Sequence, residues 1–403
     1  MFARFVLAML CLLLTACGSA APINPTRGAL PTLPNVGWRL LAESITAANA
    51  EKLALIGNLV GHKTTVNRFA FDPLRNWLIS VDAVGVAMLW DLNSGRRIQV
   101  LSQPEASDAE GDVLHAFFSA KSDTIALVTR RGVRFLRTAD RAPLPDLAGG
   151  AIAITDAARS ADGQQLATTG GTGEVWLWDA VSGRVVRRIA GNGYLAEQPL
   201  FAPDNAQLAV ISRDARSALV RVYSVRSGEV LAELRGFSST PTVLAFNPDG
   251  TLLAVGARGE VQVFRTSDYA QVYSIAAPEL EPRRGLAFSP DRRLLTIGGQ
   301  GDDVFVQAAN NGADVGRLVG HGGTLSDLAF SADGELLLTV MSSERGVYVW
   351  LVKSIQPQPS NYLRGTLGKG QNGFLTGAFS PDGKLIALAE ASGGIMVYGI
   401  PRQ

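Results

Sequence analysis

Few side chains in this sequence could carry out acid–base or nucleophilic chemistry. The chain has three histidines, His62, His115 and His321, and the first and last of these each follow a glycine. Catalysis of this kind needs a base beside a nucleophile, with a third group that orients the base. No His-x-x-x-His or Gly-x-Ser-x-Gly pattern occurs. The sequence therefore predicts no catalytic residue, and we expect a protein that is not an enzyme.

Two glycine-rich stretches and one acidic pair could bind phosphate or a cation. Gly170–Gly173 and Gly298–Gly301 lack the following helix that a phosphate-binding loop requires, so we interpret both as turns. Asp302 and Asp303 are adjacent, and adjacent side chains on a strand point to opposite faces, which disfavours a shared ion. We expect no cofactor and no metal site.

The two cysteines, Cys11 and Cys17, both lie near the N-terminus, which excludes a disulfide framework in the rest of the chain.

Residues 1–16 have the form of a signal peptide, with Arg4 followed by an apolar run too short to span a bilayer permanently. The stretch Leu14-Thr15-Ala16-Cys17 resembles the lipobox of bacterial lipoproteins. That resemblance implies cleavage before Cys17, lipidation of its thiol and an extracytoplasmic protein anchored to a membrane, at the cell surface or on the periplasmic side.

The composition of the sequence divides the rest of the chain into a tether, a lead-in segment and a repeat domain. Residues 17–37 are rich in Ala, Pro, Asn, Thr and Gly and predict a flexible tether. Residues 38–50 predict a lead-in segment or short helix, and residues 51–403 one repeat domain. Lys plus Arg total 37 and Asp plus Glu total 36, so no charge excess suggests nucleic-acid binding.

One strand–turn–strand unit recurs along this domain. Its clearest copy runs from Val243 to Val255, where Pro248, Asp249 and Gly250 form the turn between two apolar runs. Eight copies align on one anchor position: Phe71, Phe118, Arg159, Phe201, Phe246, Phe288, Phe330 and Phe379. A third apolar run follows each copy, and a more polar fourth run follows most of them. A period in the forties with four short strands predicts an all-β fold, an eight-bladed β-propeller.

The last copy ends after its third strand, and an apolar run from Lys52 to Val60 precedes the first copy. We expect this N-terminal run to supply the missing fourth strand and close the ring. The second copy is weak and its approach is loop-like, so seven blades with an irregular insert is the alternative.

The repeats resemble the WD40 family over roughly residues 51–400. Gly61-His62 precedes the first copy, which ends in Trp90-Asp91, and Gly320-His321 precedes the seventh, which ends at Trp350. In this family, His, Ser or Thr, Asp and Trp form a buried hydrogen-bond network. Counting back from the tryptophans places Val84 and Glu344 at the Asp position, so we expect no repeat to hold the full network.

The resemblance implies a non-catalytic module that binds or scaffolds proteins, and we expect a monomeric propeller with a protein partner. We predict a partner-contact rim formed by the loops between second and third strands and between blades. Its candidate residues are Arg130, Arg131, Arg213, Arg216, Arg258, Arg283, Arg284 and Arg345. The alternative is a propeller enzyme or ligand sensor that binds a small molecule, sugar or peptide in the axial funnel.

Overall fold

The computed structural model describes residues 38, 41–102, 112–144, 153–191, 193–214, 216–276, 285–298, 303–319, 321, 324–342, 346–352, 355, 363–367 and 373–401. The predicted signal peptide, the tether and Cys17 lie outside the described residues.

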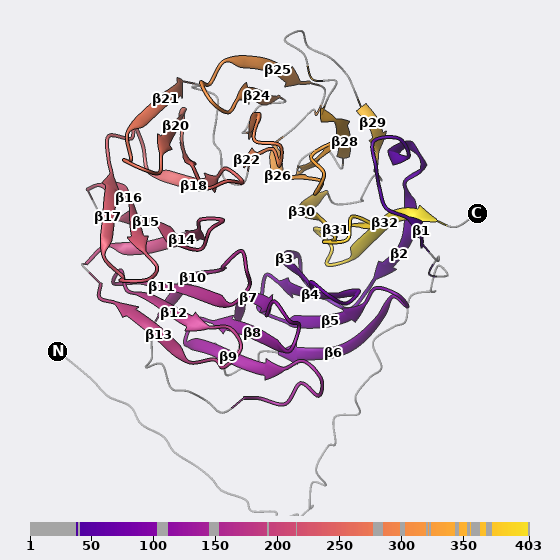
Figure 1. The fold of residues 1–403 in the computed structure, drawn as a ribbon. Helices are drawn as coiled ribbons and strands as arrows, with labels where there is room; N and C mark the ends of the chain where they lie inside the picture. Colours follow the sequence, from indigo (N-terminus) through magenta and orange to yellow (C-terminus); the bar gives the residue numbers. More distant parts are fainter. Residues whose placement is uncertain are drawn as a thin grey trace, which may run out of the picture. The chain divides into compact units, whose positions relative to one another are not determined.

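The described residues of the repeat domain form eight small antiparallel sheets arranged as the blades of a propeller (Figure 1). Blades one to four consist of β3 (Val66–Phe71), β4 (Trp77–Asp82), β5 (Ala87–Asp91) and β6 (Arg96–Ser102); β7 (Val113–Phe118), β8 (Thr124–Thr129) and β9 (Gly132–Arg137); β10 (Ile154–Arg159), β11 (Gln165–Gly170), β12 (Val175–Asp179) and β13 (Val185–Ile189); and β14 (Leu195–Phe201), β15 (Gln207–Arg213), β16 (Ala218–Ser224) and β17 (Val230–Leu234).

The second half of the domain repeats the pattern. Blades five to eight consist of β18 (Pro241–Phe246), β19 (Leu252–Ala257), β20 (Glu260–Arg265) and β21 (Gln271–Ala276); β22 (Leu286–Phe288), β23 (Leu294–Gly298), β24 (Val304–Ala308) and β25 (Asp314–Leu318); β26 (Leu325–Phe330), β27 (Leu336–Met341), β28 (Val347–Leu351) and β29 (Leu363–Thr366); and β30 (Phe374–Phe379), β31 (Leu385–Glu390) and β32 (Ile395–Pro401), together with β1 (Leu41–Glu43) and β2 (Ala54–Leu59).

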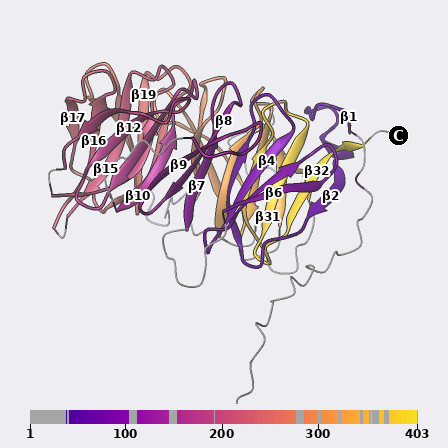
Figure 2. The same cartoon turned by 90° about the horizontal axis from the view of Figure 1, so that it is seen from below.

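The first strand of every blade lies innermost and contacts the first strand of the next blade. The contacts run β3–β7–β10–β14–β18–β22–β26–β30 and return from β30 to β3. Viewed edge-on, the blades stand side by side with their strands running between two rims (Figure 2). The prediction of eight blades is confirmed, and the seven-blade alternative is wrong because β7, β8 and β9 form a blade of their own.

The predicted ring closure is also confirmed. Strand β2 pairs antiparallel with β32, from Ala54 opposite Gly399 to Leu59 opposite Ile395. Strand β1 pairs with the far end of β32, and the short 3-10 helix η1 (Ala50–Lys52) connects the two N-terminal strands. The N-terminus therefore supplies the outer part of the last blade. The indole of Trp38 packs directly over Gly57 of β2. A side chain would not fit at this position, because a Cβ would come within 2.5 Å of the indole.

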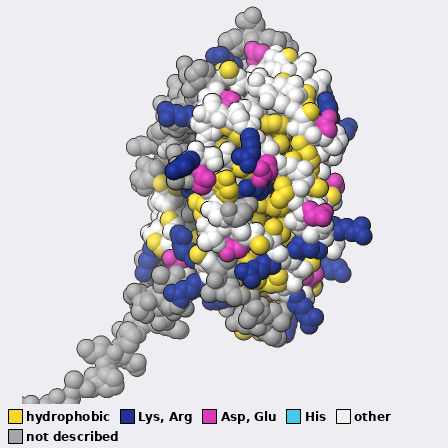
Figure 3. All heavy atoms as spheres, turned by 90° about the vertical axis from the view of Figure 1, so that its left-hand side faces the viewer, with side chains coloured by type: hydrophobic (Ala, Val, Ile, Leu, Met, Phe, Trp, Pro, Cys, Tyr) yellow, Lys and Arg dark blue, Asp and Glu magenta, His cyan; other side chains and the backbone are white. Residues whose placement is uncertain are grey.

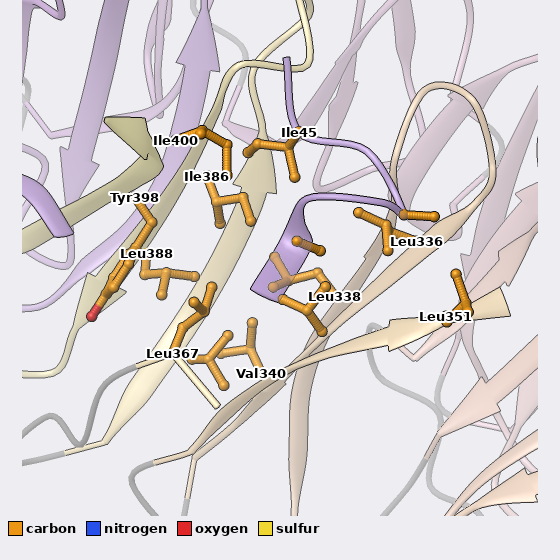
Figure 4. Close-up of a cluster of buried hydrophobic side chains, with 14 of the residues drawn as sticks. Ile45, Leu336, Leu338, Val340, Leu351, Leu367, Ile386, Leu388, Tyr398 and Ile400 are labelled. Carbon is orange, nitrogen blue, oxygen red and sulfur yellow. The ribbon is translucent and has the colours of Figure 1, made fainter. Parts of the chain in front are cut away.

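Apolar side chains fill the spaces between adjacent blades. Figure 4 shows one such cluster, in which Leu338 and Val340 of blade seven pack near Ile386 and Leu388 of blade eight. Ile45, from the segment between β1 and η1, joins this cluster and is 4% exposed. Burial of these aliphatic groups, worth roughly 25 cal/mol per Å² of apolar surface, stabilises each blade against its neighbour.

The outer strands of the blades contain more exposed residues than the inner strands, in agreement with their more polar sequences. Strands β13, β17 and β21 alternate between exposed and half-buried residues along most of their length. On the side of the ring at the left of Figure 1, exposed hydrophobic side chains lie among Lys, Arg, Asp and Glu side chains (Figure 3). The exposed large hydrophobic residues of these three strands are Val186, Val230, Leu231 and Val272.

Blade one contains a complete buried polar network, which corrects the sequence-based expectation. His62 Nδ1 lies 3.0 Å from Asp82 Oδ2, and His62 Nε2 lies 2.6 Å from Ser80 Oγ. Trp90 Nε1 donates to the same Ser80 oxygen at 2.8 Å. The acid is Asp82, two residues upstream of the predicted Val84, because the turn between β4 and β5 is longer than the count allowed.

Other blades keep parts of this network. In blade seven, His321 Nε2 and Trp350 Nε1 both bond to Thr339 Oγ1, at 3.1 and 2.8 Å. Met341, two residues after Thr339, stands where Asp82 stands after Ser80 in blade one, and the predicted Glu344 lies outside the described residues. In blade three, Trp178 Nε1 donates to Thr168 Oγ1 at 3.0 Å. Hydroxyls therefore fix the third strand to the second strand in several blades.

Ring closure predicts a sharp difference between two neighbouring residues. Leu59→Ala removes a fully buried side chain of β2 and should lower the free energy of unfolding by about 2–5 kcal/mol. Val60→Ala, at the next position and 47% exposed, should change it by less than about 0.5 kcal/mol. Urea unfolding of both variants measures the difference. Equal effects would contradict the closure of the ring by β2.

The network of blade one predicts a dependence on pH. Burial alone would raise the pKa of Asp82, but hydrogen bonds from His62 and the Val86 amide and the charge of His62 outweigh it, and the pKa lies below its usual range. A depressed carboxyl pKa stabilises the fold above the unfolded value of about 3.9, and this contribution is lost as the pH falls through the folded value. The melting temperature of wild type should exceed that of Asp82→Asn at pH 6, and the gap should narrow below about pH 4. A gap that stays constant down to pH 3 would contradict this role for Asp82.

Candidate binding site at the mouth of the axial channel

The innermost strands share a local irregularity. The pairing register shifts at the same place in most of them, as between Val66 and Arg68 in β3, Ile154 and Asp156 in β10, and Leu325 and Asp327 in β26. Strands β7, β18 and β30 carry the corresponding shift, and β14 carries one slightly further along, between Glu197 and Leu200. A β-bulge redirects side chains, so consecutive residues such as Asn67 and Arg68 both face the channel.

The position three residues before each anchor lies at or beside the bulge in seven of the eight blades, and its residues, one from each blade, form a ring; those of blades one to five line the axial pocket. In blade order it holds Arg68, His115, Asp156, Gln198, Val243, Gly285, Asp327 and Thr376. Several of these bond to the next blade. His115 Nε2 lies 2.6 Å from Asp156 Oδ1, and the Gln198 amide donates to Asp156 Oδ2 at 3.1 Å. Thr376 Oγ1 donates to Asp327 Oδ2 at 2.5 Å. Polar contacts therefore join blades two, three and four, and blades seven and eight, at the axis.

A pocket of about 900 Å³ opens above this ring. The pocket lies near the rim that carries the loops between the second and third strands. Arg213, which lines the pocket, ends β15 directly before such a loop and pairs with Leu195 at the start of β14. Its polar lining comes from several blades and comprises Asn67, Arg68, His115, Asp156, Glu197, Gln198, Arg213, Thr240, Thr242 and Ser326. Its volume lies within the range typical of ligand sites.

Most charges in the pocket are paired. Burial alone would raise the pKa of Asp156, but the hydrogen bond and charge of His115 and the amides of Ala157 and Gln198 lower it below its usual range. Asp156 is therefore ionised at neutral pH. Arg213 binds Glu197 through two nitrogens at 2.8 and 3.0 Å, and the hydrogen bond to Glu197 raises the pKa of Arg213.

The structure places part of the predicted arginine rim. Arg130 and Arg131 lie in the β8–β9 turn, Arg213 and Arg216 in or beside the β15–β16 loop, and Arg258 in the β19–β20 turn, all exposed. Arg283, Arg284 and Arg345 lie outside the described residues. Arg213 lines the axial pocket, and Arg216 lines a smaller pocket of about 530 Å³ that shares Thr240 with it. The rim and the channel mouth are therefore continuous across blades four and five.

Sequence reasoning missed the ring of bulge residues. The position holds a different residue type in each blade, and a bulge has no signature in a single strand. An alignment of the eight copies on their anchors would have shown the signal, because this position holds mostly polar residues within strands that are otherwise largely apolar.

The remaining sequence candidates are accounted for where the structure describes them. Gly170–Gly173 form the turn between β11 and β12, with Gly173 at φ +89°. Asp303 pairs with Arg317 at 3.3 Å, while Asp302 lies outside the described residues. Within the described ranges, no group of three His, Cys, Asp or Glu side chains could hold a metal ion. The same ranges contain no helix long and apolar enough to cross a membrane.

The architecture thus defines a β-propeller with a polar pocket at one end of its axis. The sequence pattern of the family described as "WD domain, G-beta repeat" matches residues 53–91 and 312–350. The first match contains the complete network of blade one, and the second contains Thr339 and Trp350 of blade seven. The protein is therefore an eight-bladed propeller in which two segments match the WD40 repeat pattern.

Two known proteins with similar sequences are named as WD-repeat proteins. An uncharacterised WD repeat-containing protein of Synechocystis is 28% identical over 151 residues, which cover 37% of this chain and 41% of the relative. The human WD repeat and SOCS box-containing protein 1 is 27% identical over 106 residues, which cover 26% of this chain and 25% of the relative. The chain thus spans less than half the length of either relative.

Among solved structures, the crystal structure of the computationally designed Ika8 protein is similar. It superposes with a TM-score of 0.69 at 19% identity and covers 85% of this chain and 98% of its own. At this identity the likeness concerns the fold alone.

Proposed function

We propose that this protein is a non-catalytic scaffold that binds a protein partner with its loop-bearing rim and the adjoining mouth of the axial channel. The observation that carries the proposal is the continuity of these two features across blades four and five, where Thr240 belongs to both pockets. Exposed arginines lie in the loops between second and third strands of three blades, and one of them, Arg213, lines a pocket whose walls are joined by hydrogen bonds between blades. A rigid, arginine-bearing surface suits protein recognition because little freedom is lost on binding and guanidinium groups form directed hydrogen bonds.

We further propose that the protein is exported and anchored by lipid at Cys17. The support comes from residues 1–17, where a short basic start, an apolar run and Leu14-Thr15-Ala16-Cys17 follow in order. More than one acyl chain would make the attachment stable, since a single chain gives marginal binding. The propeller would then present its partner surface outside the cytoplasm.

A ligand sensor is the second candidate, and the pocket itself favours it. Charged and amide side chains from blades one to four converge on a volume of about 900 Å³. Sites that bind small molecules are usually concave, and a small number of polar groups converge in them. Thermal-shift measurements across a metabolite panel separate the two functions: the sensor requires strong stabilisation by one small molecule, and the scaffold requires none.

The scaffold function predicts that partner recovery depends on the rim. Protein isolated from native membranes should bring down a partner, and Arg213→Ala/Arg216→Ala should lose most of it because two exposed guanidinium groups are removed. Arg137→Ala/Arg265→Ala is the matched control, because both arginines are exposed and pair with an acid three residues on, at the opposite rim. Quantitative mass spectrometry compares the three samples. Equal recovery by all three would contradict the rim as the binding surface.

The lipid anchor predicts a change of compartment. Cys17→Ala should abolish incorporation of labelled palmitate and move the protein from the membrane fraction to the soluble or secreted fraction. Cys11→Ala should do neither, because Cys11 lies within the segment that export would remove. Retention of label by the Cys17 variant would exclude lipidation at this residue.

A further inference from the structure

Arg68 differs from the other charged groups of the axial pocket. Arg213 is bound by Glu197, and the two oxygens of Asp156 accept from His115, Ala157 and Gln198. Arg68 is half-buried, and its guanidinium donates to the carbonyl of Asn67 at 3.0 Å. No carboxylate of the described residues forms an ion pair with it. Within the part of the chain that the structure describes, its charge at the mouth of the channel is therefore not paired with a carboxylate.

The surroundings of Arg68 restrict what can bind there. Asp156 and Glu197 lie in the same pocket, so a doubly charged phosphate would meet more repulsion than a singly charged carboxylate. Blades seven and eight contribute apolar side chains to the lining, Leu325 and Leu375. A ligand that places a carboxylate on Arg68 can therefore place an aliphatic group against these leucines.

We propose that the channel mouth recognises an acidic residue of the partner protein, an Asp or Glu flanked by aliphatic residues, through an ion pair with Arg68. This inference rests on the proposed scaffold function and names the chemistry of its partner. Arg68 can donate two parallel hydrogen bonds to one carboxylate, which is the geometry that guanidinium groups favour. The same chemistry could come from a free dicarboxylate, and the test separates the two sources.

The test selects heptapeptides from a random phage-displayed library on the immobilised full-length protein. Peptides selected by wild type should be enriched in Asp and Glu beside aliphatic residues. A selected peptide should bind Arg68→Gln about tenfold more weakly, as expected for the loss of one charge-assisted interaction. Arg265→Gln is the matched control and should bind like wild type, because Arg265 lies at the opposite rim.

Charge reversal keeps the test independent of folding. Arg68→Glu should lose the acidic peptides and select peptides enriched in Lys and Arg, which an unfolded variant would not do. Selection without acidic enrichment, or equal affinity of wild type and Arg68→Gln, would overturn the proposal. Binding of glutarate as tightly as the selected peptides would overturn the assignment to a partner segment and favour the sensor.

The outcome is separable from that of the scaffold function. If a partner is recovered through the arginine rim while no acidic peptide binds, only the role of Arg68 fails. If acidic peptides bind and no partner is recovered, the peptide site stands and the proposed dependence on the rim fails.

Discussion

The pairing of β2 with β32 is the interaction on which the rest of this structure depends. Without it, β32 would present an open edge, and blade eight would lack an outer strand along most of β32. The pairing joins residues near both ends of the domain, so the ring is held by a contact of very high sequence separation. Ile56 and Leu59 complete the apolar packing between blades eight and one, and the segment around Ile45 completes the packing between blades seven and eight. Closure therefore supports both neighbours of the last blade, and it brings β30 against β3 at the axis.

Two sets of hydrogen bonds add specificity to this apolar packing, one within blades and one at the axis. Within blade one, the His62–Asp82–Ser80–Trp90 network fixes the third strand to the second and is almost fully buried. At the axis, bonds such as His115–Asp156 and Thr376–Asp327 join one blade to the next. Polar groups that lose their hydrogen-bond partners away from water cost free energy, so both sets disfavour alternative arrangements of the strands. The axial set also holds the walls of the pocket in place, which connects the packing of the ring to its candidate function.

The sequence was a good guide to the fold because each blade repeats the same local signals. The turn at Asn247–Gly250 formed as expected, with Gly250 at φ +72°, and the same turn recurs with Asn205 and Arg292 in the left-handed region. The network of blade one was misjudged because loop length between the second and third strands varies, so counting back from a tryptophan gives the wrong residue. An axial funnel was considered as the alternative, but most of the residues that line the pocket were not predicted, because bulges bring different residue types from different blades together there. The functional role of the arginine rim stays a prediction, since location alone does not show binding.

The closure of the ring can be tested most directly by a register-specific disulfide. In a chain whose Cys11 and Cys17 are replaced by Ala, Asn58→Cys/Met396→Cys places two thiols at paired positions of β2 and β32. Paired positions in a sheet lie within the distance that a disulfide spans. The pair should oxidise readily and give a faster-migrating band on a non-reducing gel, whereas Asn58→Cys/Val397→Cys should not, because its side chains lie on opposite faces. Failure of the first pair to link, or equal linking of both pairs, would contradict a propeller closed by its N-terminal strand.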